Sequence, residues 1–223
     1  FLFWVMYTWQ YAGKIKTGLI KFVNLQPHIP ILNALSNDTE FPKYTTHLVY
    51  LTNSTRQEKI EERIIRSIYY NSPKRADIYW FVHIHVTDEP YTTEYKTETI
   101  EKDEIMRVTF NLGFRIVPRI NILLKKVLNE LYEQKEFNVS HSDKLFYRHN
   151  PAGEYRFIVF DSYLSQENEL PLWKRIPMKL YFMIKILDLD TKRSFGLDDS
   201  LVTEEKLALV ESAQNIKLKR ITV

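Results

Sequence analysis

Residues 76–86 read ADIYWFVHIHV and decide the fold. β-Branched and aromatic side chains dominate this stretch, and such a run favours a buried strand. A turn at 88–90 follows, and residues 91–100 then alternate Thr and Tyr with charged side chains, which is typical of a half-exposed edge strand. The apolar stretch EIMRVTFNLGF at 104–114 predicts the next strand. We therefore expect these three strands to form an antiparallel meander.

Helical patterns flank these strands on both sides. Residues 55–58 match a capping box, and isoleucines at four-residue steps follow it, which predicts a helix. Apolar residues recur over 120–131 with the clearest helical spacing in the chain. Short apolar stretches at 47–51 and 154–164 predict two more strands. The sequence thus predicts an α/β (α+β) fold, a mixed and largely antiparallel sheet packed by helices on one or both faces.

The N-terminal end differs from the rest of the chain. Its first nine residues, FLFWVMYTW, hold eight apolar side chains, and three lysines follow before any acidic residue. Aromatic residues beside lysines are typical of the cytoplasmic end of a transmembrane helix, and an ordinary buried helix with a basic turn is the alternative. We expect residues 1–23 to be such a helix end with a basic juxtamembrane segment, 24–45 a linker with a short helix, and 46–223 a cytosolic domain.

Composition excludes several classes of function. The 223 residues contain no cysteine, so disulfides, thiolate metal sites and cysteine nucleophiles are excluded. Only 5 glycines are present, and neither a glycine-rich phosphate loop nor a serine nucleophile motif occurs. The formal net charge of +3 is too small to indicate nucleic-acid binding. We therefore expect no enzyme activity, no cofactor and no nucleic-acid partner.

One histidine pair lies inside the first predicted strand. His83 and His85 are two residues apart, so strand alternation puts both on the same face, where two imidazoles could share a metal ion. A metal-dependent hydrolase is therefore one hypothesis. The barrel that carries such pairs needs about 250 residues and eight βα units, which this chain lacks. Structural histidines are the favoured interpretation, and no metal site is predicted.

Four basic residues stand where predicted strands begin or end. Lys74 and Arg75 precede the first strand of the predicted meander, whereas Arg115 and Arg119 lie where a strand meets a helix. Guanidinium groups and helix N-terminal amides both attract phosphate. Aromatic residues nearby that could stack on a base are Tyr79, Trp80, Tyr91 and Phe114. The predicted phosphate and base site is Lys74, Arg75, Tyr79, Arg115 and Arg119, and solvated charges at strand ends are the alternative.

Several stretches, taken in order, resemble one protein family. They are PKRADIYWFVH at 73–83, VTDEPY at 86–91, RVTFNLGFR at 107–115, EYRF at 154–157 and NELP at 168–171. Together they resemble the C-terminal cytosolic region of Kup-type potassium uptake permeases from lactic-acid and related Firmicutes bacteria, over essentially the whole chain. The combination of VTDEPY followed by LGFR is the most specific part of this resemblance. The opening segment is similar to the end of that family's last transmembrane helix.

The resemblance implies a function that the residues alone do not indicate. Members of the family are membrane symporters that move potassium, usually with protons, through a transmembrane domain that this chain does not contain. Firmicutes relatives are inhibited by the second messenger cyclic di-AMP, so the resemblance implies a regulatory domain at the cytoplasmic face of the membrane that senses this nucleotide. A two-fold symmetric ligand suits a homodimer. A purely structural dimerisation domain without a small-molecule ligand is the alternative.

Overall fold

The computed structural model describes residues 2–56, 58–70, 72–137, 153–164, 172–185 and 195–209. The chain divides into two compact units. One, called here the sheet unit, comprises residues 21–160 and 189–205. The other, called here the helical unit, comprises residues 1–20, 161–188 and 206–223.

A six-stranded mixed sheet has the strand order β5-β6-β4-β2-β7-β8. Its strands are β2 (Lys43–Leu51), β4 (Arg75–Thr87), β5 (Thr93–Glu101), β6 (Ile105–Gly113), β7 (Tyr155–Leu164) and β8 (Val202–Leu209). The pairs β2·β4, β2·β7 and β4·β6 are parallel, and β5·β6 is antiparallel. The α/β class is confirmed, but the prediction of a largely antiparallel sheet is wrong, because the sheet is mostly parallel.

The predicted meander is also wrong, because β6 rather than β5 lies beside β4. Nearly every residue of β6 is buried or half-buried, whereas β5 is largely exposed. A meander would place the Thr, Glu and Lys side chains of β5 between two apolar strands. The chain instead passes from β4 over the end of β6 and returns as the edge strand β5. Gly113 makes room for this crossing, since a Cβ atom there would lie 2.5 Å from the carbonyl oxygen of Pro90.

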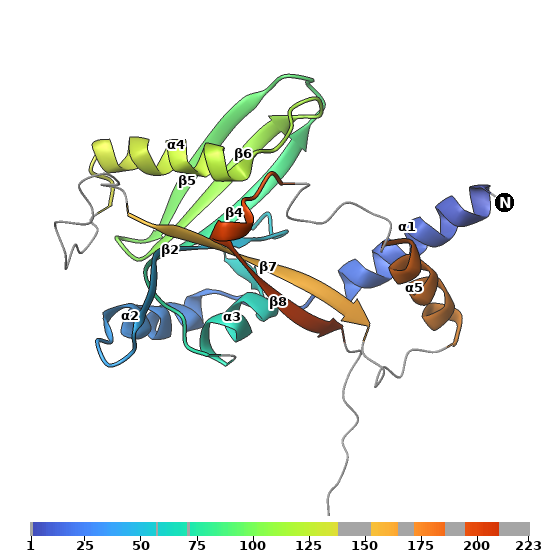
Figure 1. The fold of residues 1–223 in the computed structure, drawn as a ribbon, viewed down its shortest axis with the longest axis horizontal. Coiled ribbons are helices and arrows are strands. Elements are labelled where there is room, and N and C mark those ends of the chain that lie inside the picture. The colour runs from blue at the N-terminus through green and yellow to red at the C-terminus, as the bar shows by residue number, and fades with distance from the viewer. Residues whose placement is uncertain are drawn as a thin grey trace, which may run out of the picture. The chain divides into compact units, whose positions relative to one another are not determined.

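Helices cover both faces of the sheet (Figure 1). Helices α2 (Ile29–Asn37) and α3 (Glu62–Tyr69) pack on one face, and α4 (Ile120–Glu133) packs on the other. Alternation along β4 explains both cores, because Ile78 and Trp80 pack with α4 whereas Tyr79 and Phe81 pack with α2 and α3. Both faces of β4 are therefore buried, as parallel sheets require.

Short elements fill the segment between residues 21 and 61. Strands β1 (Phe22–Asn24) and β3 (Lys59–Glu61) form a two-stranded antiparallel sheet, and the 3-10 helix η1 (Gln26–His28) leads into α2. The segment 24–45, predicted as a linker, thus contains ordered elements, and Leu25 and Leu32 lie buried in the core. The capping-box prediction is wrong: residues 59–61 form β3, and α3 begins only at Glu62. A second 3-10 helix, η3 (Asp199–Leu201), precedes β8.

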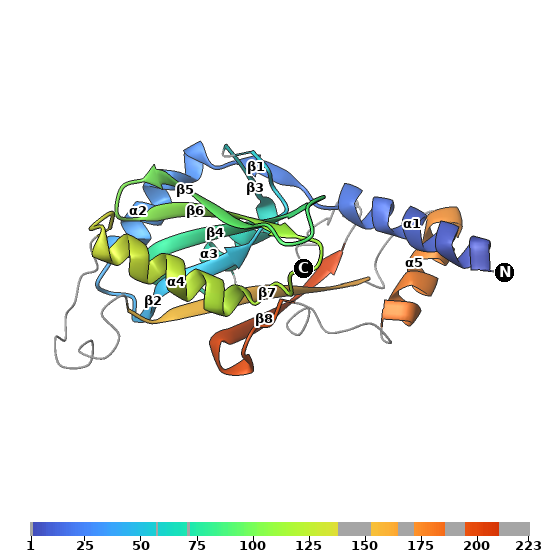
Figure 2. The ribbon, with the colours of Figure 1, turned by 90° about the horizontal axis from the view of Figure 1, so that it is seen from above.

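Two helices, α1 (Leu2–Gly18) and α5 (Leu172–Lys185), pack side by side in the helical unit (Figure 2). Ala12 and Met178 are buried between them, and the rings of Trp9 and Tyr181 lie 4.7 Å apart. In the first half of α1, Phe3 and Met6 are exposed. Within the described residues, no helix combines the length and the apolar character that a membrane span requires.

Candidate functional site

Lys74, the first predicted site residue, is bound inside the protein. Its Nζ atom lies 2.6 Å from Glu205 Oε1 and donates to the carbonyl oxygen of Ser67, also at 2.6 Å. The hydroxyl groups of Ser67 and Tyr50 are 2.9 Å apart, which extends the network under the sheet. Only 6% of the Lys74 side chain is exposed. Lys74 therefore ties the edge strand β8 to α3 and β4, and its charge is matched internally.

Arg75 and Tyr79, beside Lys74, are also engaged in internal contacts. Arg75 donates from Nε to the carbonyl oxygen of Ser36 at 3.1 Å and from Nη1 to that of Phe41 at 3.2 Å. Tyr79 is 0% exposed, and its hydroxyl group donates to the carbonyl oxygen of Lys74 at 3.0 Å. Burial raises the pKa of the Tyr79 phenol, so it stays neutral. A ring with no exposed face cannot stack on a base.

Arg115 and Arg119 lie at the other end of the sheet. Arg75 begins the 13-residue strand β4, and Thr87, which ends it, pairs with Gly113 two residues before Arg115. At about 3.3 Å per residue, the two groups of predicted residues are roughly 40 Å apart. The five predicted residues therefore form two separate groups within one chain, and only the second is exposed.

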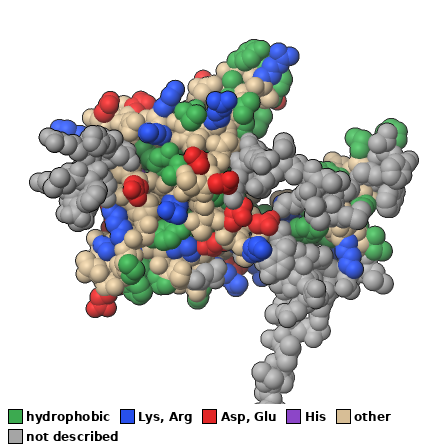
Figure 3. All heavy atoms as spheres, in the orientation of Figure 1, with side chains coloured by type: hydrophobic (Ala, Val, Ile, Leu, Met, Phe, Trp, Pro, Cys, Tyr) green, Lys and Arg blue, Asp and Glu red, His purple; other side chains and the backbone are tan. Residues whose placement is uncertain are grey.

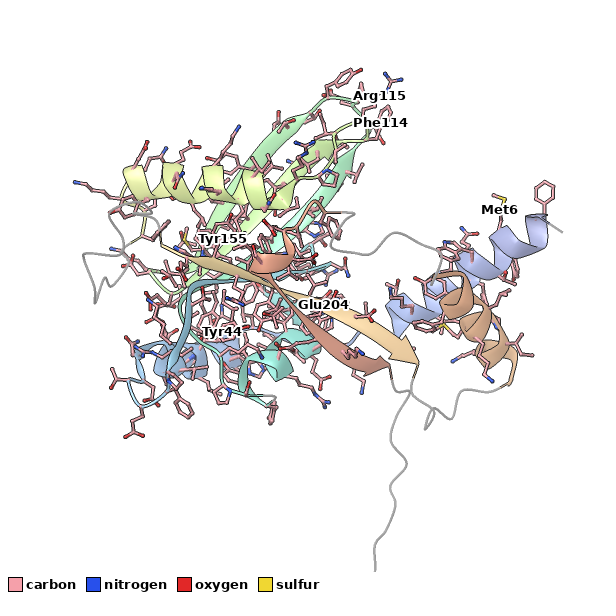
Figure 4. The ribbon with its side chains drawn as sticks, viewed as in Figure 1. Met6, Tyr44, Phe114, Arg115, Tyr155 and Glu204 are labelled. Carbon is pink, nitrogen blue, oxygen red and sulfur yellow. The ribbon has the colours of Figure 1, made fainter. Side chains whose placement is uncertain are left out.

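The chain crossing at the end of β6 positions Arg115. The Arg115 amide donates to the carbonyl oxygen of Pro90 at 3.1 Å, and its Nη1 atom donates to the hydroxyl group of Tyr91 at 3.1 Å. Tyr91 and Phe114 are 66% and 59% exposed. The stretches VTDEPY and LGFR, distant in sequence, thus meet in one corner. Figure 4 shows Phe114 and Arg115 projecting from this end, where Figure 3 shows hydrophobic and basic side chains together.

An open hollow of about 420 Å³ adjoins this corner and is lined by Glu89, Pro90, Tyr91, Thr92 and Glu94. The Glu89 carboxylate accepts a hydrogen bond from the Thr92 hydroxyl group at 2.9 Å. The carboxylates of Glu89 and Glu94 repel phosphate, so they disfavour an anion inside the hollow itself. An anion would therefore lie on the side of the arginines, with the hollow left for an uncharged group.

Arg119 stands at the start of α4. It occupies the N-cap position without a side-chain cap, and its carbonyl oxygen accepts from the amides of Ile122 and Leu123 at 3.1 Å. The Ile120 amide donates to the carbonyl oxygen of Phe195 at 3.0 Å, so part of the first turn is already satisfied. The positive end of the helix dipole and two guanidinium groups still make this end attractive to an anion.

The two histidines of the pair differ in their surroundings. His83 Nδ1 lies 3.0 Å from the carbonyl oxygen of Thr52, and His85 is exposed at the end of β4. Among the described residues, no group of three His, Asp or Glu side chains could hold a metal ion. The geometry therefore gives no support to a shared metal site.

Sequence reasoning missed Arg107, which is buried near the start of β6. It is 3% exposed and donates from Nη1 to the carbonyl oxygen of Arg56 at 2.6 Å and from Nη2 to that of Ser54. Glu61, also buried, accepts from the Asn53 amide at 3.0 Å. These two charges fix the connection between β2 and β3. A lone arginine within an apolar strand was the available signal, since a buried charge requires partners.

Residues 45–210 match the model of a family described as K+ potassium transporter C-terminal domain. The chain belongs to this family. The match includes the crossing at Gly113 and both groups of basic residues. Because this is a family of transporter domains, the chain is not an enzyme, and the hydrolase hypothesis falls with that finding. The resemblance to Kup-type permeases is confirmed.

Curated relatives extend the match to nearly the whole chain. The chain is 41% identical over 221 residues to a "Probable potassium transport system protein Kup" of Cytophaga hutchinsonii, covering 99% of the chain and 34% of that protein. A protein of the same description from Flavobacterium johnsoniae is 41% identical over 219 residues, covering 98% and 33%. "Probable potassium transport system protein Kup 2" of Lactococcus lactis is 35% identical over 211 residues, covering 95% and 31%. The chain thus spans about a third of these relatives. No solved structure matches.

Proposed function

We propose that the chain is the cytosolic regulatory domain of a potassium uptake transporter, and that the whole protein is a potassium/proton symporter. The match of residues 45–210 to the transporter C-terminal domain family carries this proposal. The chain spans about a third of relatives described as probable potassium transport proteins, which leaves room in them for a transmembrane domain. That domain is the first expected partner of the chain.

Residues 1–23 are the proposed junction with the transmembrane domain. In α1, Phe3, Met6 and Tyr7 are 89%, 66% and 65% exposed. Exposed apolar area in water costs about 25 cal/mol per Å², so these side chains suit contact with lipid or with apolar protein. Lys14 and Lys16 follow in the same helix, on the side expected to face the cytoplasm.

Cyclic di-AMP is the proposed regulatory ligand, bound at the Arg115 end of the sheet. Exposed guanidinium groups and exposed aromatic rings adjoin there, whereas Lys74, Arg75 and Tyr79 are engaged in internal contacts. The ligand carries two phosphates and two bases, and each protomer of the proposed homodimer would bind it at its own Arg115 corner. Nucleotide binding can inhibit uptake only if its affinity differs between two arrangements of the dimer.

Isothermal titration calorimetry with cyclic di-AMP tests this proposal. Loss of one charge-assisted phosphate contact should cost about 1.5–3 kcal/mol, so Arg115→Ala and Arg119→Ala should each weaken binding roughly 10- to 150-fold. Arg66→Ala is the matched control, because Arg66 is an exposed arginine on α3 that bridges to Glu62. No heat and no thermal shift at millimolar nucleotide would reject binding by this chain. An equal loss in the control would reject the Arg115 site.

A purely structural dimerisation domain is the second candidate. The internal pairing of Lys74 with Glu205 favours it, since that network stabilises the fold without offering a charge to a ligand. This function predicts a dimer whose mass in light scattering does not respond to nucleotide. A nucleotide-dependent change in mass or shape would exclude it.

A further inference from the structure

The outer edge of β5 provides a contact surface for a second copy of the chain. We propose that β5 pairs antiparallel with the β5 of a partner protomer, with the two-fold axis at Thr97, so that the two sheets become continuous. The inference deepens the proposed homodimer and rests on it, but it does not depend on nucleotide binding. Strand β5 is nine residues long and ends the order of the sheet among the described residues.

The alternation of hydrogen bonds along β5 decides which of its backbone groups point away from β6. The amides of Gly113 and Arg115 donate to the carbonyl oxygens of Thr92 and Pro90, at 2.7 and 3.1 Å. In an antiparallel pair, every second residue of a strand directs both its amide and its carbonyl group toward the neighbouring strand. In β5 these are the even-numbered residues, which hydrogen-bond to β6. The amide and carbonyl groups of Tyr95, Thr97 and Thr99 therefore point away from β6 and are available to another strand.

Charge and length together fix the register. Thr97 is the midpoint of Thr93–Glu101, so an axis there gives the longest self-pairing, which is regular up to the register shift after Thr99. Thr97 then faces its own copy as a hydrogen-bonded pair, and Lys96 faces the partner's Glu98 in the closer, non-hydrogen-bonded kind of pair. Within one chain, Lys96 Nζ already lies 2.7 Å from Glu98 Oε1. The dimer would join two such ion pairs into one alternating group of four charges.

Other two-fold registers are worse. An axis at Lys96 sets two lysines against each other, and an axis at Glu98 does the same with two glutamates, which is unfavourable. Axes at Tyr95 or Thr99 shorten the paired length. The edge itself favours pairing, because Thr and Tyr are strong β-formers. Lys96 and the register shift after Thr99 are features that discourage an edge strand from pairing with another chain, but they block the edge of β5 only in part.

Cysteine cross-linking tests the register directly, because the chain has no cysteine of its own. In a Thr97→Cys variant of the 223-residue chain, the paired Cα atoms would be about 5.5 Å apart, within the range for a disulfide. Thr93→Cys is the matched control on the same strand and face. Its two copies would be offset by eight residues, about 26 Å. Mild oxidation should therefore produce a covalent dimer from Thr97→Cys and not from Thr93→Cys.

A charge exchange and light scattering complete the test. Lys96→Glu or Glu98→Lys alone should shift the wild-type dimer toward monomer, and the double exchange should restore it, because opposite charges face each other again. A monomeric wild type would reject both the homodimer and this surface. A wild-type dimer that gives no Thr97→Cys cross-link, or equal cross-linking of the control, would reject the β5 edge alone. Nucleotide binding by the same chain is measured separately and is not affected by either result.

Discussion

Replacement of Gly113 by alanine tests the chain crossing that distinguishes this fold from a meander. An added Cβ atom would meet the carbonyl oxygen and carbon of Pro90 and the carbonyl oxygen of Glu89, with the Pro90 oxygen at 2.5 Å. All three are backbone atoms, so no side chain can rotate away. Relief requires the connection between β4 and β5 to lift from the end of β6.

The expected loss of stability follows from two opposing effects. Overpacking in a close-packed site costs about 1–3 kcal/mol, and an immovable backbone neighbour favours the upper end, about 3 kcal/mol. Alanine in a strand is better than glycine by about 0.5–1 kcal/mol. The net loss should therefore be about 2 kcal/mol, which lowers the melting temperature by roughly 4–8 °C for a chain of this size.

Urea unfolding followed by circular dichroism measures this loss. Gly13→Ala is the matched control, because no atom lies within 4 Å of a Cβ added in the middle of α1. Alanine should stabilise that helix slightly and leave the main transition unchanged or raised. A Gly113→Ala protein as stable as the wild type would refute the described crossing. Moreover, Arg115 is bonded to this connection, so the variant should also weaken any ligand site at the corner.

Three further predictions concern buried or perturbed charges. Lys74→Met should lower the free energy of unfolding by about 3–5 kcal/mol, because Glu205 loses its partner in a nearly buried site, and urea unfolding measures this. Arg107→Met should lower it by about 1–3 kcal/mol for each carbonyl group left unpaired, and should speed amide hydrogen exchange in the connection between β2 and β3. A hydrogen bond to Glu130 and partial burial raise the pKa of Tyr95 from 10.0 to about 12. Because the pKa of Tyr95 is higher in the folded state, its contribution to stability is present below pH 10 and is lost as the pH rises toward 12. A phenolate absorbance titration of the wild type, compared with Tyr95→Phe, should show one phenol that ionises with the raised pKa.

The strands were predictable because each carries its own local signal. Alternation and β-branched residues located β4, β6 and β7 to within a few residues, and the exposed pattern of β5 indicated an edge strand. The order of strands was not predictable by the same reasoning, since consecutive strands usually pair. Two facts in the sequence pointed the other way: β6 is far more apolar than β5, and β6 ends at Gly113.

The candidate site was predictable only in part. Lys74 and Arg75 were grouped because they are adjacent in sequence. The burial of Lys74 depends on its ion pair with Glu205, which is more than a hundred residues away, and nothing in the local sequence indicates that pairing. Tyr79 could have been excluded from the site, because it lies in the middle of an apolar run where both faces of β4 are buried. Tyr91 and Phe114 were among the stacking candidates and remain exposed, since they lie in the connections beyond the strands.

Regulation of potassium flux tests the central claim most directly. The full-length transporter that contains this chain would be reconstituted in liposomes, and potassium uptake would be measured with and without cyclic di-AMP on the side that corresponds to the cytoplasm. We expect the nucleotide to reduce uptake by the wild-type protein, and an Arg115→Ala protein to keep its uptake at the same nucleotide concentration. Uptake that does not respond to the nucleotide, or equal inhibition of the Arg115→Ala protein, would contradict the account.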